Sequence, residues 1–353
     1  MKGLILSGGR GTRLRPITFT SAKQLVPVAN KPILFYGIEA LVESGIRQIG
    51  IVVGDTGQEI KDAVGDGSRF GATVTYIEQA APLGLAHAVL ISEAFMAGEP
   101  FVMYLGDNLI RERLAPLVER FRATAPNAQI LLARVPNPQQ FGVAELANGR
   151  VVRLVEKPKR PASDLALVGV YMFDRHVFDA VSSITPSARG ELEITDAIQW
   201  LIDHGRTVIP HVIDGWWKDT GKLEDILEAN RIILDTIDRR IEGEVEGSEV
   251  LGKVIIEVGA KVVQSTVRGP AVIGKGAMIE NAYIGPFTAV GDHAIIRSSE
   301  VEHSIILEGS TITDIGGRIE SSLIGRNVSI YRSVTKPKSY NLMLGDRSQL
   351  GLI

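Results

Sequence analysis

The chain has 353 residues, a formal net charge of −3 and no cysteine. Its length exceeds that of one ordinary compact domain, so we expect two domains. The absence of cysteine excludes disulfides, thiolate metal sites and a cysteine nucleophile, and the small net charge gives no reason to expect nucleic-acid binding. The apolar run at the N-terminus is short, and no stretch approaches the about 20 apolar residues that span a bilayer. We therefore expect a cytoplasmic protein without a membrane partner.

Up to about residue 240 the sequence alternates apolar runs with helical patterns. The runs predicted to be strands are 3–6, 48–53, 73–77, 101–105 and 129–135, and the predicted helices are 31–44, 57–64, 84–95 and 113–123. This alternation is typical of an α/β fold with a mostly parallel, Rossmann-like sheet covered on both faces. Further strands are expected at 142–146, 151–155 and 166–173. A helix at 223–237 is expected to close a domain of residues 1–240.

After residue 240 the helical pattern disappears. Aliphatic residues recur near every sixth position, often before glycine, as at Ile273-Gly274 and Val290-Gly291. This hexapeptide period predicts a parallel β-helix, which we place, with a C-terminal tail, at residues 248–353. The register of the repeat slips by one residue at Ile284. Residues 242–247 are expected to form the linker between the two domains.

The first predicted strand runs into a glycine-rich loop, Leu6-Ser7-Gly8-Gly9-Arg10-Gly11-Thr12-Arg13. Glycines let backbone N–H groups approach phosphate oxygens, and the two arginines add positive charge where a polyphosphate would lie. The loop lacks the Gly-Lys-Ser/Thr ending of a P-loop, and Leu14 replaces the third glycine of a dinucleotide-binding turn. Ligands of a parallel sheet bind beyond the carboxyl ends of its strands, where this loop and Gly106-Asp107 both fall.

The loop and five later motifs together resemble the sugar-1-phosphate nucleotidylyltransferases, in particular the members with an added C-terminal left-handed β-helix. The later motifs are, in the family's order, Lys23-Gln24-Leu25-Val26-Pro27, Leu105-Gly106-Asp107-Asn108, Glu156-Lys157-Pro158, Gly190-Glu191-Leu192-Glu193-Ile194-Thr195-Asp196 and Asp219-Thr220-Gly221. The resemblance covers essentially the whole chain. It implies a nucleotidyltransferase fold and a Mg²⁺-dependent enzyme that transfers a thymidylyl group from dTTP to α-D-glucose 1-phosphate and releases pyrophosphate.

The resemblance also implies which residues carry the reaction. Arg13 and Lys23 match the residues that hold the triphosphate and the departing pyrophosphate, and Asp107 and Asp219 match the carboxylates that bind Mg²⁺. Asp107 follows a buried run, where a charge can point into a cleft, although Gly-Asp-Asn is also good turn chemistry. Asp219 could instead cap the helix that follows it. Lys157 completes the implied catalytic set by neutralising the attacking phosphate.

Nucleotide and sugar contacts are implied in the same way. The implied nucleotide-binding residues are Leu6, Gly8, Gly9, Gly11, Thr12, Arg13, Gln24, Gln79 and Gly84, and the implied sugar-phosphate residues are Asn108, Gly142, Glu156, Lys157 and Leu167. A glutamine amide such as that of Gln79 can pair with the N3–H and O4 edge of thymine or uracil. Gly84 is expected to begin a helix whose positive end faces the nucleotide. Thymine and uracil differ by one methyl group, so some use of UTP is expected.

Several alternatives remain open from the sequence. The same chemistry could use UTP or another sugar 1-phosphate. The β-helix could be an acetyltransferase with His293 or His303 as base, which would make the protein bifunctional, or the chain could bind sugar nucleotides without turning them over. We expect the β-helix to be a structural module without catalytic residues. Its open ends and aliphatic flanks offer surfaces to a partner subunit, so we expect a homo-oligomer.

Overall fold

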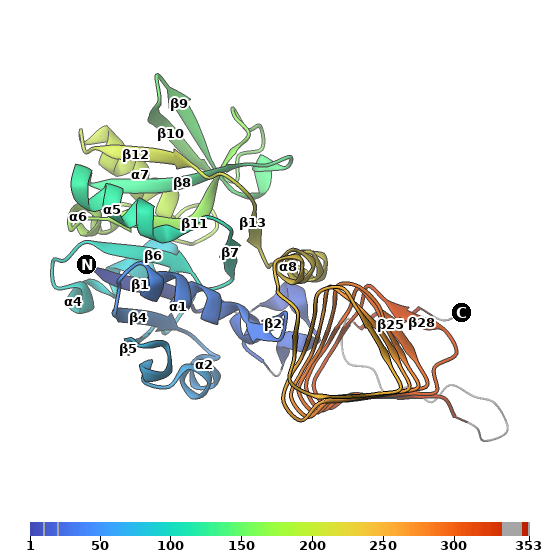
Figure 1. Cartoon of the computed structure of the whole chain (residues 1–353). Helices are drawn as coiled ribbons and strands as arrows, with labels where there is room; N and C mark the ends of the chain where they lie inside the picture. Colours follow the sequence, from blue (N-terminus) through green and yellow to red (C-terminus); the bar gives the residue numbers. More distant parts are fainter. Residues whose placement is uncertain (10, 20, 334–347, 352–353) are drawn as a thin grey trace. The chain divides into compact units, whose positions relative to one another are not determined.

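The computed structural model describes residues 1–9, 11–19, 21–333 and 348–351 (Figure 1). The chain forms two compact units. The first contains Met1–Arg10, Ser21–Leu25 and Ile33–Asp219, and the second contains Gly11–Thr20, Val26–Pro32 and Thr220–Ile353. Most of the C-terminal tail expected within residues 248–353 lies outside the described residues.

The first unit is built on a nine-stranded mixed sheet with a parallel core (Figure 1). In the core, β1 (Lys2–Ser7) pairs in parallel with β4 (Gln48–Val53) and β6 (Phe101–Leu105), and β4 pairs in parallel with β5 (Thr73–Glu78). The other strands are β8 (Ala128–Arg134), β9 (Gly142–Ala147), β10 (Arg150–Glu156), β11 (Leu165–Phe173) and β12 (Val208–Val212). Strand β11 runs antiparallel to β6, β8 and β9. The predicted α/β class is confirmed.

Helices cover both faces of this sheet because its strands alternate their apolar side chains between two cores. Leu4 and Leu6 of β1 join one core with α3 (Leu85–Leu90), α4 (Glu93–Met96), α6 (His176–Ser183) and α7 (Ile194–Asp203). Ile5 joins the other core with α1 (Ile33–Glu43), α2 (Gly57–Val64) and α5 (Leu114–Thr124). A strand that is apolar on both sides is typical of a covered parallel sheet.

The helix predicted at 84–95 is two helices. α3 ends at Leu90 and α4 begins at Glu93. Between them, the fully buried Ser92 hydroxyl donates a hydrogen bond to the Ala88 carbonyl at 2.7 Å. A serine that bonds back to the preceding turn bends or interrupts a helix. The single-helix prediction was therefore wrong at this point.

The strand order places a topological switch point beside β1. The chain passes from β1 to β4 and β5 on one side and then returns to β6 on the other side of β1. At such a switch point the loops after neighbouring strands diverge and leave room for a ligand. The loops concerned here are the glycine-rich loop after β1 and Gly106-Asp107 after β6.

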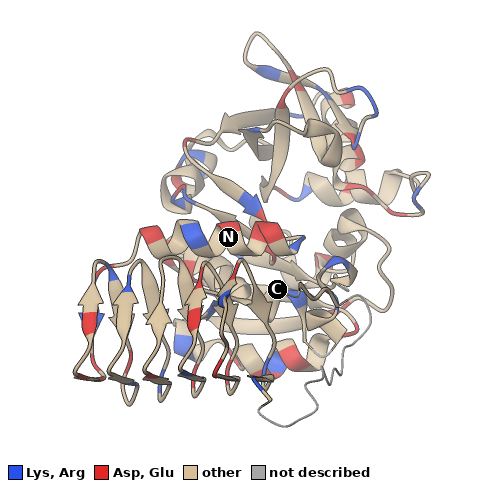
Figure 2. Cartoon of the chain, turned by 90° about the vertical axis from the view of Figure 1, so that its right-hand side faces the viewer, with Lys and Arg blue, Asp and Glu red and all other residues tan. Residues whose placement is uncertain are grey.

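The second unit contains a parallel β-helix of three sheets, seen along its axis in Figure 1 and from the side in Figure 2. The first sheet contains β14 (Arg240–Ile241), β17 (Val254–Ile256), β20 (Ala271–Ile273), β23 (Thr288–Val290), β26 (Ile305–Ile306) and β29 (Leu323–Ile324). The second contains β15 (Glu244–Glu246), β18 (Lys261–Val263), β21 (Met278–Glu280), β24 (Ile295–Arg297), β27 (Thr311–Thr313) and β30 (Ser329–Tyr331). The third contains β16 (Glu249–Leu251), β19 (Thr266–Arg268), β22 (Tyr283–Ile284), β25 (Glu300–Glu302) and β28 (Arg318–Glu320).

The number of residues in each coil explains why the register of the hexapeptide repeat slips. In the early coils a residue pairs with the residue 17 positions later, as Val262 with Ile279, whereas in the last coils the step is 18, as Ile312 with Ile330. A step of 17 is one residue short of three hexads, so the aliphatic residues shift by one position in each early coil. These residues stack into one buried core.

The expected linker and the helix after Asp219 both belong to the second unit. Residues 242–247 are not a linker, because β15 within them is the second strand of the first coil. Helix α8 (Leu223–Asp235) groups with the β-helix rather than with the sheet. The last passage of the chain from the first unit to the second falls between Asp219 and Thr220. A boundary between independently folding domains at residues 240–248 stays a prediction.

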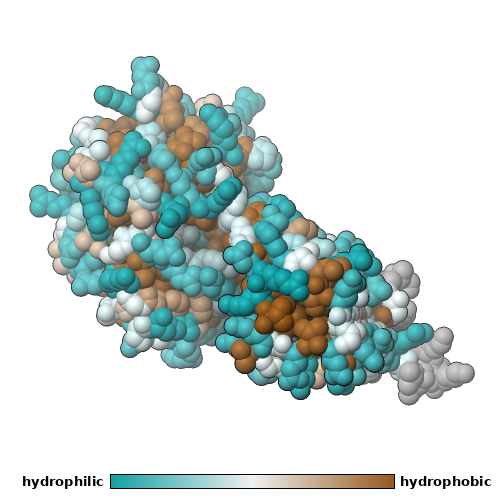
Figure 3. Space-filling model, viewed as in Figure 1, coloured by the Kyte–Doolittle hydropathy of each residue, from teal (hydrophilic) through white to brown (hydrophobic). Residues whose placement is uncertain are grey.

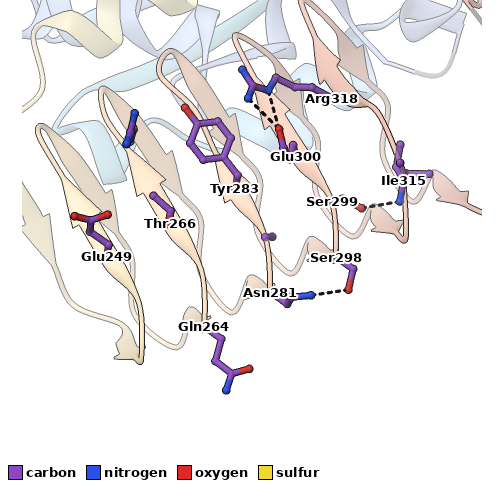
Figure 4. Close-up of a pocket in the computed structure, with 13 residues that line it drawn as sticks. Glu249, Gln264, Thr266, Asn281, Tyr283, Ser298, Ser299, Glu300, Ile315 and Arg318 are labelled. Atoms are coloured by element: carbon purple, nitrogen blue, oxygen red, sulfur yellow. Dashed lines mark hydrogen bonds and ion pairs between the residues drawn. The ribbon is translucent and has the colours of Figure 1, made fainter. Parts of the chain in front are cut away.

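Two surface features mark the β-helix. Its first coil exposes three large apolar side chains, Ile241, Val245 and Leu251, which are between 39% and 41% exposed (Figure 3). Val258, in the turn after β17 of the second coil, is 63% exposed. The outer face of the third sheet carries a shallow depression of about 660 Å³ lined by polar residues (Figure 4). Within it, the Arg318 guanidinium donates to the Glu300 carboxylate at 3.0 Å, so these charges neutralise each other.

Candidate active site

Two glutamines flank the glycine-rich loop after β1. A Cβ atom built on Gly8 would lie 3.1 Å from the Gln79 Oε1 atom, and one built on Gly9 would lie 3.8 Å from the Gln24 Nε2 atom. Gln24 is 2% exposed, and its Oε1 atom has no hydrogen-bond partner among the residues that the structure describes. The structure therefore brings together Gly8, Gly9, Gln24 and Gln79, four of the predicted nucleotide-binding residues.

The ammonium group of Lys23 lies between two aspartates. Lys23 is part of the 3-10 helix η3 (Lys23–Leu25) and its side chain is 8% exposed. Its Nζ atom donates a hydrogen bond to Asp107 Oδ2 and lies 3.8 Å from Asp219 Oδ1. Three residues predicted to be catalytic, far apart in the sequence, thus form one cluster in the first unit.

A short antiparallel ladder brings the two aspartates together. Strand β7 (Asn108–Ile110) pairs with β13 (Trp217–Asp219), and in this register Asp219 lies opposite Asn108. Asn108 directly follows Asp107, so the ladder places one carboxylate beside the other. Asp219 belongs to a strand, and the following helix begins only at Leu223 with Lys222 as its N-cap residue. The helix-capping alternative for Asp219 is therefore excluded.

Asn108 holds the Asp107 carboxylate in place. Its Nδ2 atom donates to Asp107 Oδ1 at 2.9 Å, and its Oδ1 atom accepts a 2.6 Å hydrogen bond from the Trp217 indole. Asn108 is 2% exposed. Both ends of its side chain are engaged within the protein, so the geometry gives it a positioning role. A contact between Asn108 and the sugar stays a prediction.

The charge state of Asp107 follows from these neighbours. Burial raises the pKa of the Asp107 carboxyl group. The Lys23 charge and the hydrogen bonds from Lys23 and Asn108 lower this pKa by more than burial raises it, so the net pKa lies below the ordinary value. Asp107 is therefore ionised at neutral pH. Within the part of the chain that the structure describes, no group of three or more His, Cys, Asp or Glu side chains could hold a metal ion. Asp107 and Asp219 are two carboxylates close to one another here, and their binding of Mg²⁺ stays a prediction.

The predicted sugar residues form a second cluster in the first unit. Glu156, at the end of β10, pairs with Gly142 at the start of β9. A Cβ atom on Gly142 would lie 2.9 Å from Leu167 Cδ1 and 3.1 Å from Glu156 Oε2, so only a glycine fits without displacing them. Lys157 is half exposed, and its Nζ atom lies 3.5 Å from Glu156 Oε1. The structure brings Gly142, Glu156, Lys157 and Leu167 together.

Burial and neighbouring charges act on the Glu156 carboxyl group in opposite directions. Burial raises its pKa, the Lys157 and Arg189 charges lower it, and the Glu193 carboxylate raises it again. The net pKa lies above the ordinary value. Glu156 therefore takes up a proton more readily than an exposed glutamate does.

Arg189 was not predicted from the sequence. Its guanidinium lies 3.4 Å from Glu156 Oε1 and 3.5 Å from Glu193 Oε1, and it also pairs with Glu191. Its position directly before the Gly190–Asp196 motif could have indicated a role, but no residue of that motif had been assigned one. It adds a second cation beside Glu156.

Gly84 is packed against Leu192 of the Gly190–Asp196 motif. Its φ is 105°, and a Cβ atom there would lie 2.4 Å from the Leu192 carbonyl oxygen, so the close approach requires glycine. Gln79 Nε2 donates to the Gly84 carbonyl at 3.2 Å. The Ala86 N–H in the first turn of α3 donates to the Leu192 carbonyl at 3.0 Å. One of the N-terminal donors of this six-residue helix is therefore engaged within the protein.

The remaining predicted residues lie at either end of the loop. Leu6 is buried in β1, in the first unit. Gly11, Thr12 and Arg13 belong to the second unit, where η1 (Thr12–Leu14) carries an exposed Arg13. A Cβ atom on Gly221 would lie 2.7 Å from Arg13 Nη2, so the Arg13 guanidinium packs against the backbone after Asp219-Thr220. Arg10, the other arginine of the loop, lies outside the described residues.

Comparison with known proteins defines the class. The model of the nucleotidyl transferase family matches residues 2–236, and the chain belongs to this family. It is 56% identical over 351 residues to a glucose-1-phosphate thymidylyltransferase of Streptomyces griseus and 55% identical over 353 residues to one of Streptomyces antibioticus, in both cases covering 99% of each chain. The predicted family membership is confirmed.

A solved structure supports the same assignment for about two thirds of the chain. It is a Bacillus anthracis protein assigned as a glucose-1-phosphate thymidylyltransferase, with a TM-score of 0.63 and 37% identity. The match covers 66% of this chain and 94% of that one. Among the described residues, no helix is both long enough and apolar enough to cross a membrane.

Proposed function

We propose that the chain transfers the thymidylyl group of dTTP to α-D-glucose 1-phosphate, giving dTDP-glucose and pyrophosphate. The observation that carries this proposal is the identity of 56%, over 99% of each chain, with a protein named for this reaction. A cytoplasmic location, expected from the sequence, is part of the same proposal.

The reaction makes one bond and breaks one. A phosphate oxygen of glucose 1-phosphate attacks the α-phosphorus of dTTP, and the bond from that phosphorus to the bridging oxygen of the β-phosphate breaks. The attacking oxygen is already ionised, so no general base is needed. The barrier comes from bringing two anions together in line, and cations and hydrogen bonds that hold them lower it.

Lys23, Asp107 and Asp219 fit a site for Mg²⁺ and phosphate. Both aspartates approach the Lys23 ammonium, so they already surround a positive charge. Mg²⁺ is commonly held by one or two carboxylates together with substrate phosphates and water, which matches the two carboxylates here. Bound there, Mg²⁺ would neutralise charge on the phosphate groups. Lys23 would then turn toward the triphosphate, and Arg13 would bind the same group.

Glu156, Lys157 and Arg189 fit the sugar phosphate. The Glu156 carboxylate can accept hydrogen bonds from sugar hydroxyls, and the exposed Lys157 ammonium can neutralise the attacking phosphate. Gly142 lacks the side chain that would displace Leu167 and Glu156, so Glu156 keeps its place beside the Gly142 backbone. Arg189, 3.4 Å from Glu156, holds that carboxylate and adds a second positive charge.

The glutamines beside the glycine-rich loop fit a pyrimidine base. The amide of Gln79 can both donate and accept, which matches the N3–H and O4 groups of thymine. Gln24 offers a buried acceptor without a partner among the described residues. A purine presents a larger and different edge, so we propose rejection of purine nucleotides and a modest preference for dTTP over UTP.

Among the residues that the structure describes, the coils offer no site for acetyl transfer comparable to the cluster around Lys23. His293 and His303 both lie in left-handed conformations, with φ of 56° and 44°, at corners between strands. The Nε2 atom of His303 is buried. Neither side chain is part of a cluster like the one around Lys23.

The test is pyrophosphate release from dTTP, UTP, CTP, ATP and GTP, each with several sugar 1-phosphates and Mg²⁺. The proposal requires the highest kcat/KM with dTTP and glucose 1-phosphate, lower activity with UTP and none with purine nucleotides. A higher kcat/KM with UTP or with another sugar phosphate would correct the substrate. Consumption of acetyl-CoA would add the second activity.

We also propose that the chain forms a homo-oligomer through the first coil of the β-helix. Strands β14, β15 and β16 each end their sheet, and the apolar side chains of this coil are exposed (Figure 3). Every copy presents the same three edges, so a twofold contact would cover them in both copies at once. Light scattering of Val245→Glu, in β15 of this coil, should give a lower mass than the wild type, and an equal mass would overturn this contact.

A further inference from the structure

The two segments that flank Lys23 in the sequence belong to the second compact unit. Lys23 lies in Ser21–Leu25 of the first unit, whereas Gly11–Thr20 and Val26–Pro32 group with the residues from Thr220 onward. Val26 is only three positions after Lys23, and so short a stretch of chain spans at most about 10 Å. A displacement of the flanking segments is therefore transmitted to the segment that carries the Lys23 ammonium.

The segment after Lys23 is a hairpin with a strained turn. Strand β2 (Pro27–Val28) pairs with β3 (Lys31–Pro32) around the two-residue turn Ala29-Asn30. Both turn residues are left-handed, with φ of 48° and 61°. Asparagine tolerates this conformation, but alanine disfavours it, so the surroundings must hold the turn.

Two asparagine amides tie this turn to one coil of the β-helix. Asn230 of α8 is fully buried; its Oδ1 atom accepts a 2.8 Å hydrogen bond from the Ala29 N–H, and its Nδ2 atom donates to the Phe287 carbonyl at 2.9 Å. Asn30 donates directly to the Val290 carbonyl at 2.7 Å. Phe287 directly precedes β23 and Val290 is its last residue, so both links reach the same coil.

The segment before Lys23 rests on another coil. The Thr18 hydroxyl donates to the Gly11 carbonyl at 2.7 Å and closes this loop on itself. A Cβ atom built on Gly325, directly after β29, would lie 3.5 Å from Ile17 Cδ1. Both flanks of the Lys23 segment are therefore supported by the β-helix.

We propose that Asn30 and Asn230 are positioning residues through which the β-helix fixes the Lys23 segment for nucleotidyl transfer. The proposal rests on the proposed function, because Lys23 acts there on the triphosphate. It gives the β-helix a part in catalysis without any catalytic residue in the coils. Loss of these hydrogen bonds moves Lys23 relative to Asp107 and Asp219. A misplacement of about 1 Å at a reacting centre can cost on the order of 100-fold in rate.

The decisive comparison is between Asn30→Gly and the matched variant Asn281→Gly. Asn281 also sits in the left-handed region, with φ of 47°, and its Nδ2 atom donates one 3.2 Å hydrogen bond, to Ser298 Oγ, within the β-helix (Figure 4). Each variant loses one side-chain hydrogen bond and gains a glycine at a position that suits glycine. The two variants differ in whether the lost bond holds the hairpin.

Asn30→Gly should lower kcat/KM for dTTP by about 10-fold or more, with an unchanged KM for glucose 1-phosphate. Asn281→Gly should keep the wild-type values. Asn30→Asp keeps the size of the side chain and its tolerance of the turn but cannot donate to the Val290 carbonyl, so it should behave like Asn30→Gly. Wild-type kcat/KM in Asn30→Gly and Asn30→Asp would overturn the proposal, including when thermal stability falls, because Asn30 would then be merely structural.

Hydrogen exchange without substrate tests the link independently of the reaction. Deuterium uptake by the peptide of residues 21–26 should rise in Asn30→Gly and not in Asn281→Gly. Equal uptake in the two variants would overturn the link. If the wild-type protein releases no pyrophosphate from dTTP, the proposed function fails, and the exchange experiment still decides whether the coils hold the Lys23 segment.

Discussion

Asp219 lies opposite Asn108 in the ladder between β7 and β13, and this pairing brings two carboxylates from distant parts of the sequence to one ammonium group. Asn108 links them, because it follows Asp107 in the chain and donates to the Asp107 carboxylate at 2.9 Å. The Trp217 indole in turn holds Asn108. The site thus depends on a ladder of three residues per strand.

The first prediction concerns the charge of Asp107. Asp107→Asn should lower kcat by about 10²- to 10³-fold, because a lost charge interaction with the reacting phosphates weakens stabilisation of the transition state most. Steady-state pyrophosphate release at saturating Mg²⁺ and substrates measures this. Asp62→Asn removes an exposed carboxylate of α2 that accepts a hydrogen bond from Gln58, and it should leave kcat unchanged. A wild-type kcat in Asp107→Asn would show that this carboxylate is not a metal ligand.

The second prediction concerns the support of Asn108. A Cβ atom on Gly169 of β11 would lie 2.6 Å from Asn108 Oδ1. Gly169→Ala should therefore displace Asn108, lower kcat, and reduce the free energy of unfolding by about 1–3 kcal/mol through overpacking. Gly316→Ala is the matched control, because its added methyl group would lie no closer than 3.9 Å, from Arg332 Nη1, to any atom of the neighbouring residues that the structure describes. Thermal unfolding together with steady-state kinetics would contradict the positioning role if Gly169→Ala lost stability but kept its kcat.

The third prediction concerns base recognition. Gln79→Ala removes an amide that can make two hydrogen bonds to a pyrimidine, a loss of about 1–3 kcal/mol. The KM for dTTP and the KM for UTP should rise by the same factor, because the amide does not contact the thymine methyl group. Gln58→Ala, at an exposed position of α2, is the control. Kinetics with both nucleotides test this, and a change in the ratio of the two kcat/KM values would show that Gln79 does not read this edge.

Motifs and periodicity predicted the α/β unit, the β-helix and most of the members of the site. They could not show how the members meet. The ladder that joins Asp107 and Asp219 is too short to leave a periodic pattern, and strands of this length carry no signal of their partner. Arg189 forms ion pairs with Glu191 and Glu193, which are close to it in the sequence, and with Glu156, which is not. The sequence does not show the pair with Glu156.

The largest surprise is the grouping of the segments on either side of Lys23 with the β-helix. The hydrogen bonds of Asn30 and Asn230 reach carbonyl groups more than 50 residues away. Backbone carbonyls are present at every residue, so nothing in a sequence marks which of them will accept such a bond. The 17-residue coil was visible only as a slip in the repeat, because its cause is the pairing of neighbouring coils.

The last prediction is a pH dependence that arises from Glu156. Burial is the main cause that holds the pKa of this carboxyl group above its ordinary value of 4.5. As the pH falls from neutrality, Glu156 is therefore protonated before an exposed glutamate would be, and it loses the charge that strengthens its hydrogen bonds to sugar hydroxyls. The KM for glucose 1-phosphate should rise as the pH falls toward 4.5, whereas the KM for dTTP should not depend on the protonation of Glu156.

Stability should change in the opposite sense. The folded protein binds this proton more tightly than the unfolded chain does, so the contribution of Glu156 to the free energy of unfolding is greatest below pH 4.5 and is lost as the pH rises through its raised pKa. Glu156→Gln carries no titrating group and should show a high KM for glucose 1-phosphate at every pH, without loss of thermal stability at neutral pH. The sugar phosphate itself titrates in this range, so the measurement is the difference between wild type and Glu156→Gln across the pH series. Parallel KM profiles for the two proteins would mean that Glu156 does not bind the sugar as a carboxylate.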